Sequence, residues 1–176
     1  MNYDIIIPVF ADQVLHMGAE GYGFLLSASG FGSLMSALFI ATRVKNRPSP
    51  KLLYISGLMV SVFMVAAGFI HSYKLAIVNL AIMGFFNMMF MTLANSTIQL
   101  SVDDKFRGRV MSVYTLAFAG TTPIGNLITG AVIYKYGPGA GFLMCGGIAG
   151  VLILALMILT LTKAGEQAKG APGHSA

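Results

Sequence analysis

The stretch Gly141–Thr162 reads GFLMCGGIAGVLILALMILTLT and contains no Asp, Glu, Lys or Arg. A helix needs about 20 apolar residues to cross a hydrocarbon layer about 30 Å thick. Four further stretches are also free of charge and approach or exceed that length, namely Gly21–Thr42, Leu52–Ile70, Leu75–Gln99 and Val110–Tyr134. A soluble helical domain would instead place charged residues on one face of each helix. The sequence therefore predicts an all-α membrane protein with about five full transmembrane helices.

The composition agrees with this prediction. Hydrophobic residues make up 56% of the chain and charged residues 10%, and the mean hydropathy is +0.79. Soluble domains carry about 25% charged residues. Although the net charge is +5, the basic residues lie almost wholly in loops, so we expect the lipid bilayer and no nucleic acid as a partner. Cys145 is the only cysteine, and the three histidines lack ligand spacing, so we expect no disulfide, metal site or cofactor.

The loops differ in their positive charge. The loop Arg43–Lys51, the loop Ser101–Arg109 and the C-terminal tail together hold nine Lys and Arg residues, whereas the alternate loops hold only Lys74 and Lys135. Loops rich in Lys and Arg stay in the cytoplasm. We therefore expect the C-terminus of the chain to be cytoplasmic and the first full helix to enter from the outside.

The first twenty residues contain the apolar run Ile5–Phe10, which is too short to cross a bilayer and includes Pro8. It is either the end of a helix whose first half is missing or an interfacial segment. A sixth crossing would place both ends of the bundle in the cytoplasm, which favours the truncated helix. The expected organisation is a helix end and periplasmic loop at 1–20, a helical bundle at 21–163 and a cytoplasmic tail at 164–176.

Two of the predicted spans resemble each other. Residues 32–40 read GSLMSALFI and align without gaps with residues 125–133, which read GNLITGAVI. These spans lie three crossings apart and therefore run in opposite directions. Inverted three-helix repeats are typical of secondary transporters. The small alphabet of membrane helices is the alternative explanation.

Small residues recur along the spans at positions suited to close helix packing, such as Gly32 in the first and Gly146 and Gly150 in the last. The stretch Gly120–Asn126 is distinctive because Pro123 removes a backbone donor inside a span and is followed by Gly125. A neighbouring helix or water must satisfy the carbonyl that is left. This stretch is either a bending point or cavity wall, or ordinary packing.

Uncharged polar side chains inside the spans are candidates for a substrate path. Burying an unpaired amide in hydrocarbon costs about 2–7 kcal/mol, so such groups should face a cavity or another helix. Hydrogen bonding between helices accounts for most such residues. The sharper candidates for substrate contact are Asn87, Asn95, Tyr114 and Asn126.

The loop before the fourth full span reads DDKFRGRVMS at Asp103–Ser112. Asp103 and Asp104 are placed to cap a helix that begins near Phe106 and to complement its dipole. Arg107 and Arg109, on either side of Gly108, are expected to orient the loop and to contact lipid phosphates. The alternative is that both arginines pair with acidic residues or with the cytoplasmic ends of other helices in one state of a transport cycle.

This motif resembles the loop between the tenth and eleventh helices of major facilitator superfamily transporters, and in particular of the bacterial group that includes enterobactin-exporter-like proteins and transmembrane secretion effectors. Pro123–Gly125 and Tyr136–Pro138 resemble the eleventh helix and the turn after it, and Pro8–Phe10 resembles the end of the seventh helix. The resemblance implies the C-terminal six-helix half of that fold. The loop Arg43–Lys51 departs from it by lacking the superfamily's Gly/Asp/Arg signature.

The resemblance further implies secondary active, proton-coupled efflux of a small molecule by alternating access in a bacterial inner membrane. Such a mechanism requires a second six-helix half or a homodimer. In an intact seventh helix Asp4 would lie inside the membrane, where a carboxyl can bind and release a proton. A non-transporting scaffold or assembly subunit is the alternative function. An intramembrane enzyme has little support, because no span carries an acid–base pair, a Ser/His pair or a metal cluster.

Overall fold

The computed structural model describes residues 3–43 and 49–169, with side chains for all of these except 3, 4, 161 and 163–169. The described residues form six helices and no strand. The helices are α1 (Tyr3–Gln13), α2 (Gly18–Arg43), α3 (Pro50–Ala67), α4 (Tyr73–Leu100), α5 (Asp104–Tyr136) and α6 (Pro138–Lys169). The helices α2 to α6 are long and apolar enough to cross a membrane, which confirms the five predicted spans.

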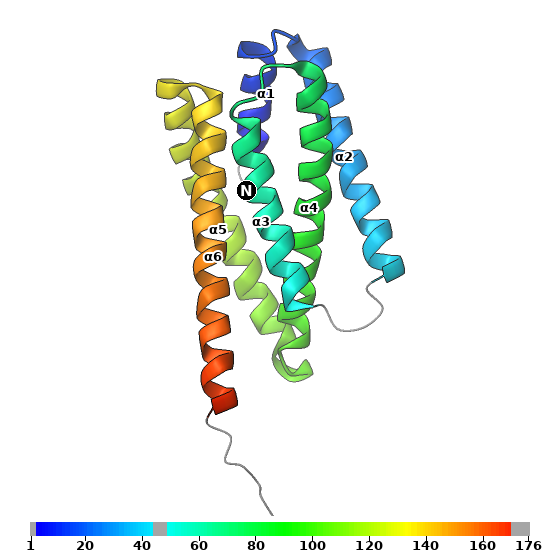
Figure 1. Cartoon of the computed structure of the whole chain (residues 1–176), viewed down its shortest axis with the longest axis vertical. Coiled ribbons are helices and arrows are strands. Elements are labelled where there is room, and N and C mark those ends of the chain that lie inside the picture. The colour runs from blue at the N-terminus through cyan, green and yellow to red at the C-terminus, as the bar shows by residue number, and fades with distance from the viewer. Residues whose placement is uncertain (1–2, 44–48, 170–176) are drawn as a thin grey trace, which may run out of the picture.

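The helices form an antiparallel bundle. In Figure 1 the helices α2, α4 and α6 descend, whereas α1, α3 and α5 rise. The helix α4 packs between α2 and α3, and α3 packs between α4 and α6. The helix α5 contacts α6 and the short α1. The two spans of the predicted repeat, in α2 and α5, run in opposite directions, as an inverted repeat requires.

The connections at the two ends of the bundle carry different charges. Arg43 ends α2, Lys51 lies in the first turn of α3, and the basic start of α5 lies at the same lower end in Figure 1. At the opposite end, Lys74 and Lys135 are the basic residues among those described. The predicted loop residues 44–48 lie outside the described part of the chain. The basic loops predicted from the sequence therefore lie at one end of the bundle, and the loops with fewer basic residues lie at the other.

The short helix α1 is part of the packed core. Ile6, Ile7 and Phe10 are fully buried, and the ring of Phe10 packs edge-on against Phe142 of α6 with ring centroids 5.4 Å apart. The helix contacts α2, α5 and α6 at the upper end of the bundle. With 11 residues, α1 spans about 16 Å and is too short to cross a bilayer.

The core is concentrated at the end of the bundle where α1 lies. It combines α1 with the end of α3, the beginning of α4, and the turn between α5 and α6. Members outside α1 include Met64, Leu80 and Phe142, each nearly inaccessible. Toward the basic end fewer apolar side chains are buried, and they belong mainly to α4 and α6. The bundle is thus tightly packed at one end and looser at the other.

Close backbone contact joins α2 to α4. A methyl group on Gly32 would overlap the carbonyl oxygen of Ala81, and one on Gly84 would overlap that of Ser29. The Ser33 hydroxyl also donates to the Gly84 carbonyl oxygen at 3.3 Å. Helices in lipid gain little from hydrophobic burial against each other, so such contacts supply much of the attraction. The small-residue packing predicted for the first span is present here.

The small residues of α5 behave differently. A methyl group on Gly120 or Gly130 would meet no atom within 4 Å, so neither glycine mediates close packing among the described residues. The helix continues through Pro123 from Asp104 to Tyr136 without a break. Its first two-thirds are largely exposed, with Val113 67% and Leu116 73% exposed. Packing of α5 is therefore confined mainly to its last turns.

The turn between α5 and α6 depends on one glycine. Gly137 has φ of +84°, which a residue with a side chain adopts only at a cost, and its amide donates to the Ile133 carbonyl at 2.8 Å. Pro138 then opens α6, where its missing amide hydrogen leaves no helical hydrogen bond unmade. This sequence places the end of α5 and the start of α6 side by side.

We expect Gly84→Ala to lower the melting temperature of the detergent-solubilised protein, because the added methyl forces α2 away from α4. Overpacking of this kind costs about 1–3 kcal/mol. Gly147→Ala is the matched control, since a methyl group at this exposed position of α6 meets no atom within 4 Å. Equal melting temperatures for the two variants would show that α2 and α4 are not in close contact.

Candidate functional site

The corner between α4 and α5 holds the motif that the sequence singles out. The Arg107 guanidinium pairs with the Asp104 carboxylate at 2.6 Å, and its Nε donates to the Gln99 carbonyl oxygen at 3.3 Å. Gln99 lies at the C-terminal end of α4, where backbone carbonyls lack helical partners. Arg107 therefore has both kinds of partner, an acidic residue and a helix end, that the alternative interpretation of the motif names.

The start of α5 differs in detail from the prediction. The helix begins at Asp104 rather than near Phe106, and Asp103 occupies the N-cap position without a side-chain hydrogen bond to the helix. The predicted side-chain cap at Asp103 is therefore wrong. The Asp104 carboxylate in the first turn bonds to Arg107 instead, three residues along the same face.

The rest of the motif faces outward. Gly108 is exposed, and a methyl group there would meet nothing within 4 Å. The Arg109 side chain lines a shallow pocket of about 430 Å³ together with Ile98 of α4 and with Val113 and Tyr114 of α5. The corner thus brings together two predicted candidates, Arg109 and Tyr114, that are more than one helical turn apart.

The amides of α4 have different surroundings. Asn79 is buried, and its Nδ2 donates to the Phe63 carbonyl oxygen of α3 at 3.1 Å. Asn95 accepts a hydrogen bond from Gln99 Nε2 at 3.0 Å within α4. Asn87 is half-buried on the same helix. Asn79 therefore joins two helices, whereas the polar group of Asn95 is bonded within its own helix.

The candidates in the middle of α5 are less enclosed. Tyr114 is half-buried and stacks on Phe118, with ring centroids 6.4 Å apart. Pro123 is exposed and Asn126 half-buried. Gly125 lines a separate pocket of about 280 Å³ with Thr129 and with Cys145 of α6. The structure thus places these residues along one helix and does not gather them around a single centre.

Asp4 lies in the first turns of α1, but its side chain falls outside the described residues. Within the described chain, no group of three or more His, Cys, Asp or Glu side chains is arranged to hold a metal ion.

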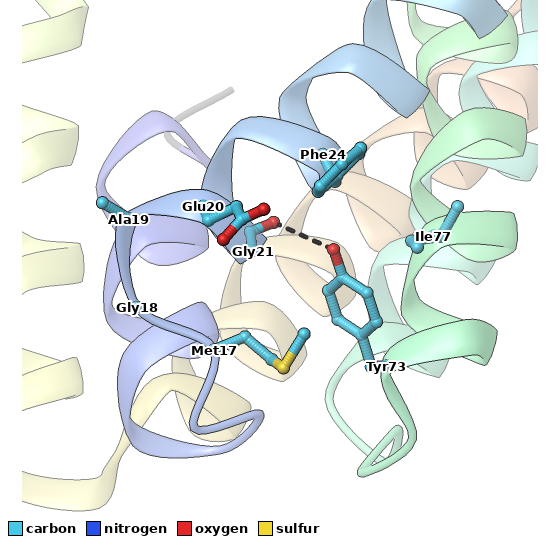
Figure 2. A pocket seen from close by; sticks show the side chains of 8 residues that line it. All are labelled: Met17, Gly18, Ala19, Glu20, Gly21, Phe24, Tyr73 and Ile77. Atoms are coloured by element: carbon cyan, nitrogen blue, oxygen red, sulfur yellow. Dashed lines mark hydrogen bonds between the residues drawn. The ribbon is translucent and has the colours of Figure 1, made fainter.

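A further pocket, an open cavity of about 620 Å³, lies at the end opposite the α4–α5 corner and was not predicted from the sequence. The residues that line it come from the start of α2 and the start of α4 (Figure 2), and they include Glu20, Phe24 and Tyr73. These segments lie about fifty residues apart in the chain, so only their packing reveals the pocket. The available signal in the sequence was Glu20, directly before the predicted span at Gly21–Thr42. A charged residue at the edge of a span is too common to indicate a pocket.

A family model described as transmembrane secretion effector matches residues 4–174 of the chain. Comparison with curated proteins and with solved structures found no match for either.

We expect Asn79→Leu to lower the melting temperature, because it removes the hydrogen bond between α4 and α3. Hydrogen bonds between membrane helices contribute about 1 kcal/mol. Asn95→Leu is the matched control, since its amide bonds within α4 and joins no second helix through that contact. A larger loss of stability for Asn95→Leu would contradict this assignment of the two amides.

Proposed function

The chain belongs to the transmembrane secretion effector family of the major facilitator superfamily, and from this premise we propose that it is one half of a proton-driven exporter of small molecules. The family match and the five helices long enough to cross a membrane identify it as a multi-pass membrane transport protein. The proposed transport is efflux that is coupled to protons and proceeds by alternating access.

One observation carries the proposal. Among the five spans, α5 has the lowest mean hydropathy and also the smallest buried share. Its exposed middle includes Thr121, Thr122 and Pro123, and Asn126 is only half-buried. Polar groups are costly in contact with lipid, so the least apolar helix should be the best covered. Because α5 is both exposed and relatively polar, its exposed surface is better suited to contact with water or with a second protein than to contact with lipid.

The two threonines reduce this cost only in part. The Thr121 and Thr122 hydroxyls donate to the carbonyls of Ala117 and Phe118, one turn earlier. The Pro123 nitrogen has no hydrogen to donate, so the helix lacks one backbone bond near the same place. A water-lined path would supply the missing donors at this depth.

Alternating access requires two bundles that rock against each other around a central site. The described chain forms one such bundle, in which most of α5 before its last turns is exposed. We propose that a second six-helix half, or a second copy of this chain, covers α5. The substrate path would then run between the two bundles and past Tyr114 and Asn126, with Asn87 and Asn95 of α4 as further candidates.

The α4–α5 corner suits a conformational role. The hydrogen bond from Arg107 to the Gln99 carbonyl oxygen at the end of α4 holds the start of α5 in place, and Asp104 of α5 pairs with the same guanidinium. A hydrogen bond contributes only about 0.5–1.5 kcal/mol, so this contact between α4 and α5, the Arg107 latch, can open at low cost during a transport cycle. Gly108, Arg109 and Gly125 belong to the same proposed moving segment as Pro123.

The charged ends support an orientation. Five basic residues, from α2, α3 and α5, lie at one end of the described bundle, and Lys74 and Lys135 lie at the other. Under the positive-inside rule the first end faces the cytoplasm. We therefore propose a bacterial inner-membrane location with α6 ending on the cytoplasmic side.

We expect the chain, joined to a six-helix partner half of the same family, to drive efflux of a fluorescent dye from vesicles that carry a proton gradient. Asn126→Leu should slow this efflux about tenfold, as the loss of one hydrogen bond in a binding path implies. Ile124→Leu is the matched control, because Ile124 is an exposed apolar residue on the other side of α5. Absence of efflux with the partner present would favour a scaffold or assembly role instead.

Proton coupling is tested at Asp4. Asp4→Asn in the same assembly should leave downhill dye movement intact and abolish its acceleration by the proton gradient, because an amide cannot bind and release a proton. Asp12→Asn, at an exposed carboxyl near the end of α1, should retain the acceleration. If Asp4→Asn keeps full gradient dependence, Asp4 has no part in coupling.

A further inference from the structure

The pocket at the upper end of the bundle lies between the first turns of α2 and α4. It has a volume of about 620 Å³ and is open to the outside. The large side chains that line it are Met17, Glu20, Phe24, Tyr73 and Ile77. Figure 2 shows Met17, Glu20, Phe24 and Tyr73 around one shared space. Small-molecule sites commonly enclose about 300–1,000 Å³, so the pocket has a suitable size.

Local structure holds the pocket in shape. Gly18 has φ of +35°, which lets the chain turn from α1 directly into α2. The Tyr73 hydroxyl lies 3.5 Å from the Gly21 carbonyl oxygen, to which it donates, so the starts of α4 and α2 are tied together (Figure 2). Tyr73 and Ile77 are half-buried against the core of the bundle. One wall is therefore fixed by the fold.

The lining has a clear chemical character. Glu20 is the one charged residue among the lining residues, and the described cations of this end, Lys74 and Lys135, do not line the pocket. The other large side chains are two aromatic rings, a thioether and an aliphatic chain. Aromatic faces attract cations, and a nearby carboxylate adds charge complementarity. Phe24 is 57% exposed, so its ring is available to a ligand.

A simpler role for Glu20 is to complement the dipole at the N-terminus of α2. That role explains a carboxylate in the first turn, but it does not require Phe24, Tyr73 and Met17 to surround the same space. An anion would meet Glu20 unfavourably, and a neutral apolar ligand would leave the carboxylate without a partner. The combination favours a ligand that is both apolar and positively charged.

We propose that this pocket binds a lipophilic organic monocation, with its charge near Glu20 and its apolar groups against Phe24 and Tyr73. The site is separate from the residues proposed above for transport, and it lies at the end opposite the α4–α5 corner. Binding here needs neither a proton gradient nor a second half. The failure of this proposal is therefore distinguishable from the failure of the transport proposal.

The experiment measures binding of radiolabelled tetraphenylphosphonium to the full chain in a nonionic detergent by equilibrium dialysis, with protein-free micelles as the background. Binding should be saturable. Benzyltrimethylammonium should displace the probe, whereas benzenesulfonate, an anion with the same single ring, should not. These two competitors separate the effect of charge from that of the ring.

Matched variants locate the site. Glu20→Gln should weaken binding about fivefold, the upper range for a solvent-exposed charge pair. Phe24→Ala should weaken it about three- to tenfold through the lost aromatic face. Asp12→Asn and Phe69→Ala, an exposed carboxyl and an exposed ring at the same end but outside the pocket, should change affinity less than twofold. All four variants should keep the melting temperature of the unaltered chain.

The proposal is overturned if binding does not exceed that of empty micelles, or if benzenesulfonate competes as well as benzyltrimethylammonium. It is equally overturned if Asp12→Asn weakens binding as much as Glu20→Gln, since general electrostatic attraction would then account for the affinity. If Glu20→Gln or Phe24→Ala lowers the melting temperature, Glu20→Asp and Phe24→Tyr replace them and should retain most of the binding.

Discussion

The hydrocarbon interior of a bilayer offers no hydrogen-bond partners, and this constraint governs the whole chain. Every backbone group inside the membrane must be satisfied within the protein, and the described spans meet this requirement as helices. Hydroxyl side chains in the spans follow the same rule. Ser27, Thr42 and Thr160 each donate to a carbonyl one turn earlier in their own helix. Few polar groups are left to join one helix to another, and those few are informative.

The contacts that do join helices divide the bundle into unequal parts. Glycine contacts and the Ser33 hydroxyl fasten α2 to α4, and the Asn79 amide fastens α4 to α3. In α6, Gly146 lies against the backbone of α3, where a methyl group would come within 3.0 Å of the Ser61 carbonyl oxygen. These four helices form one firmly packed unit. The helix α5 joins it mainly through its last turns, where Ile133 is buried and the Thr129 hydroxyl lies 3.4 Å from the Cys145 sulfur.

Local signals in the sequence predicted what depends on local physics. Charge-free runs predicted the five spans, whereas the turn at Gly137 was expected only from the resemblance of Tyr136–Pro138 to the turn after the eleventh helix of the family. The contacts of Arg107 match one of the two interpretations that its sequence motif left open. Which distant segments pack against each other was not foreseen. Gly32 and Gly120 look alike in the sequence, yet only Gly32 meets a neighbouring backbone. The pocket of Glu20 and Tyr73 likewise depends on how α2 and α4 meet, which no periodicity encodes.

The way α5 is held suggests how one bundle can serve a transport cycle. Its start is tied to α4 through Arg107 and its end is packed against α6, whereas the stretch between them is mostly exposed. Pro123 lies in that free stretch and removes one backbone hydrogen bond, so bending costs less there than elsewhere in the helix. When the contact of Arg107 with the end of α4 opens, α5 can therefore move by bending near Pro123, and the core around α1 stays as it is. In the proposed transport cycle, the tightly packed upper end stays rigid, and α5 moves against the second half or second copy that covers its polar face.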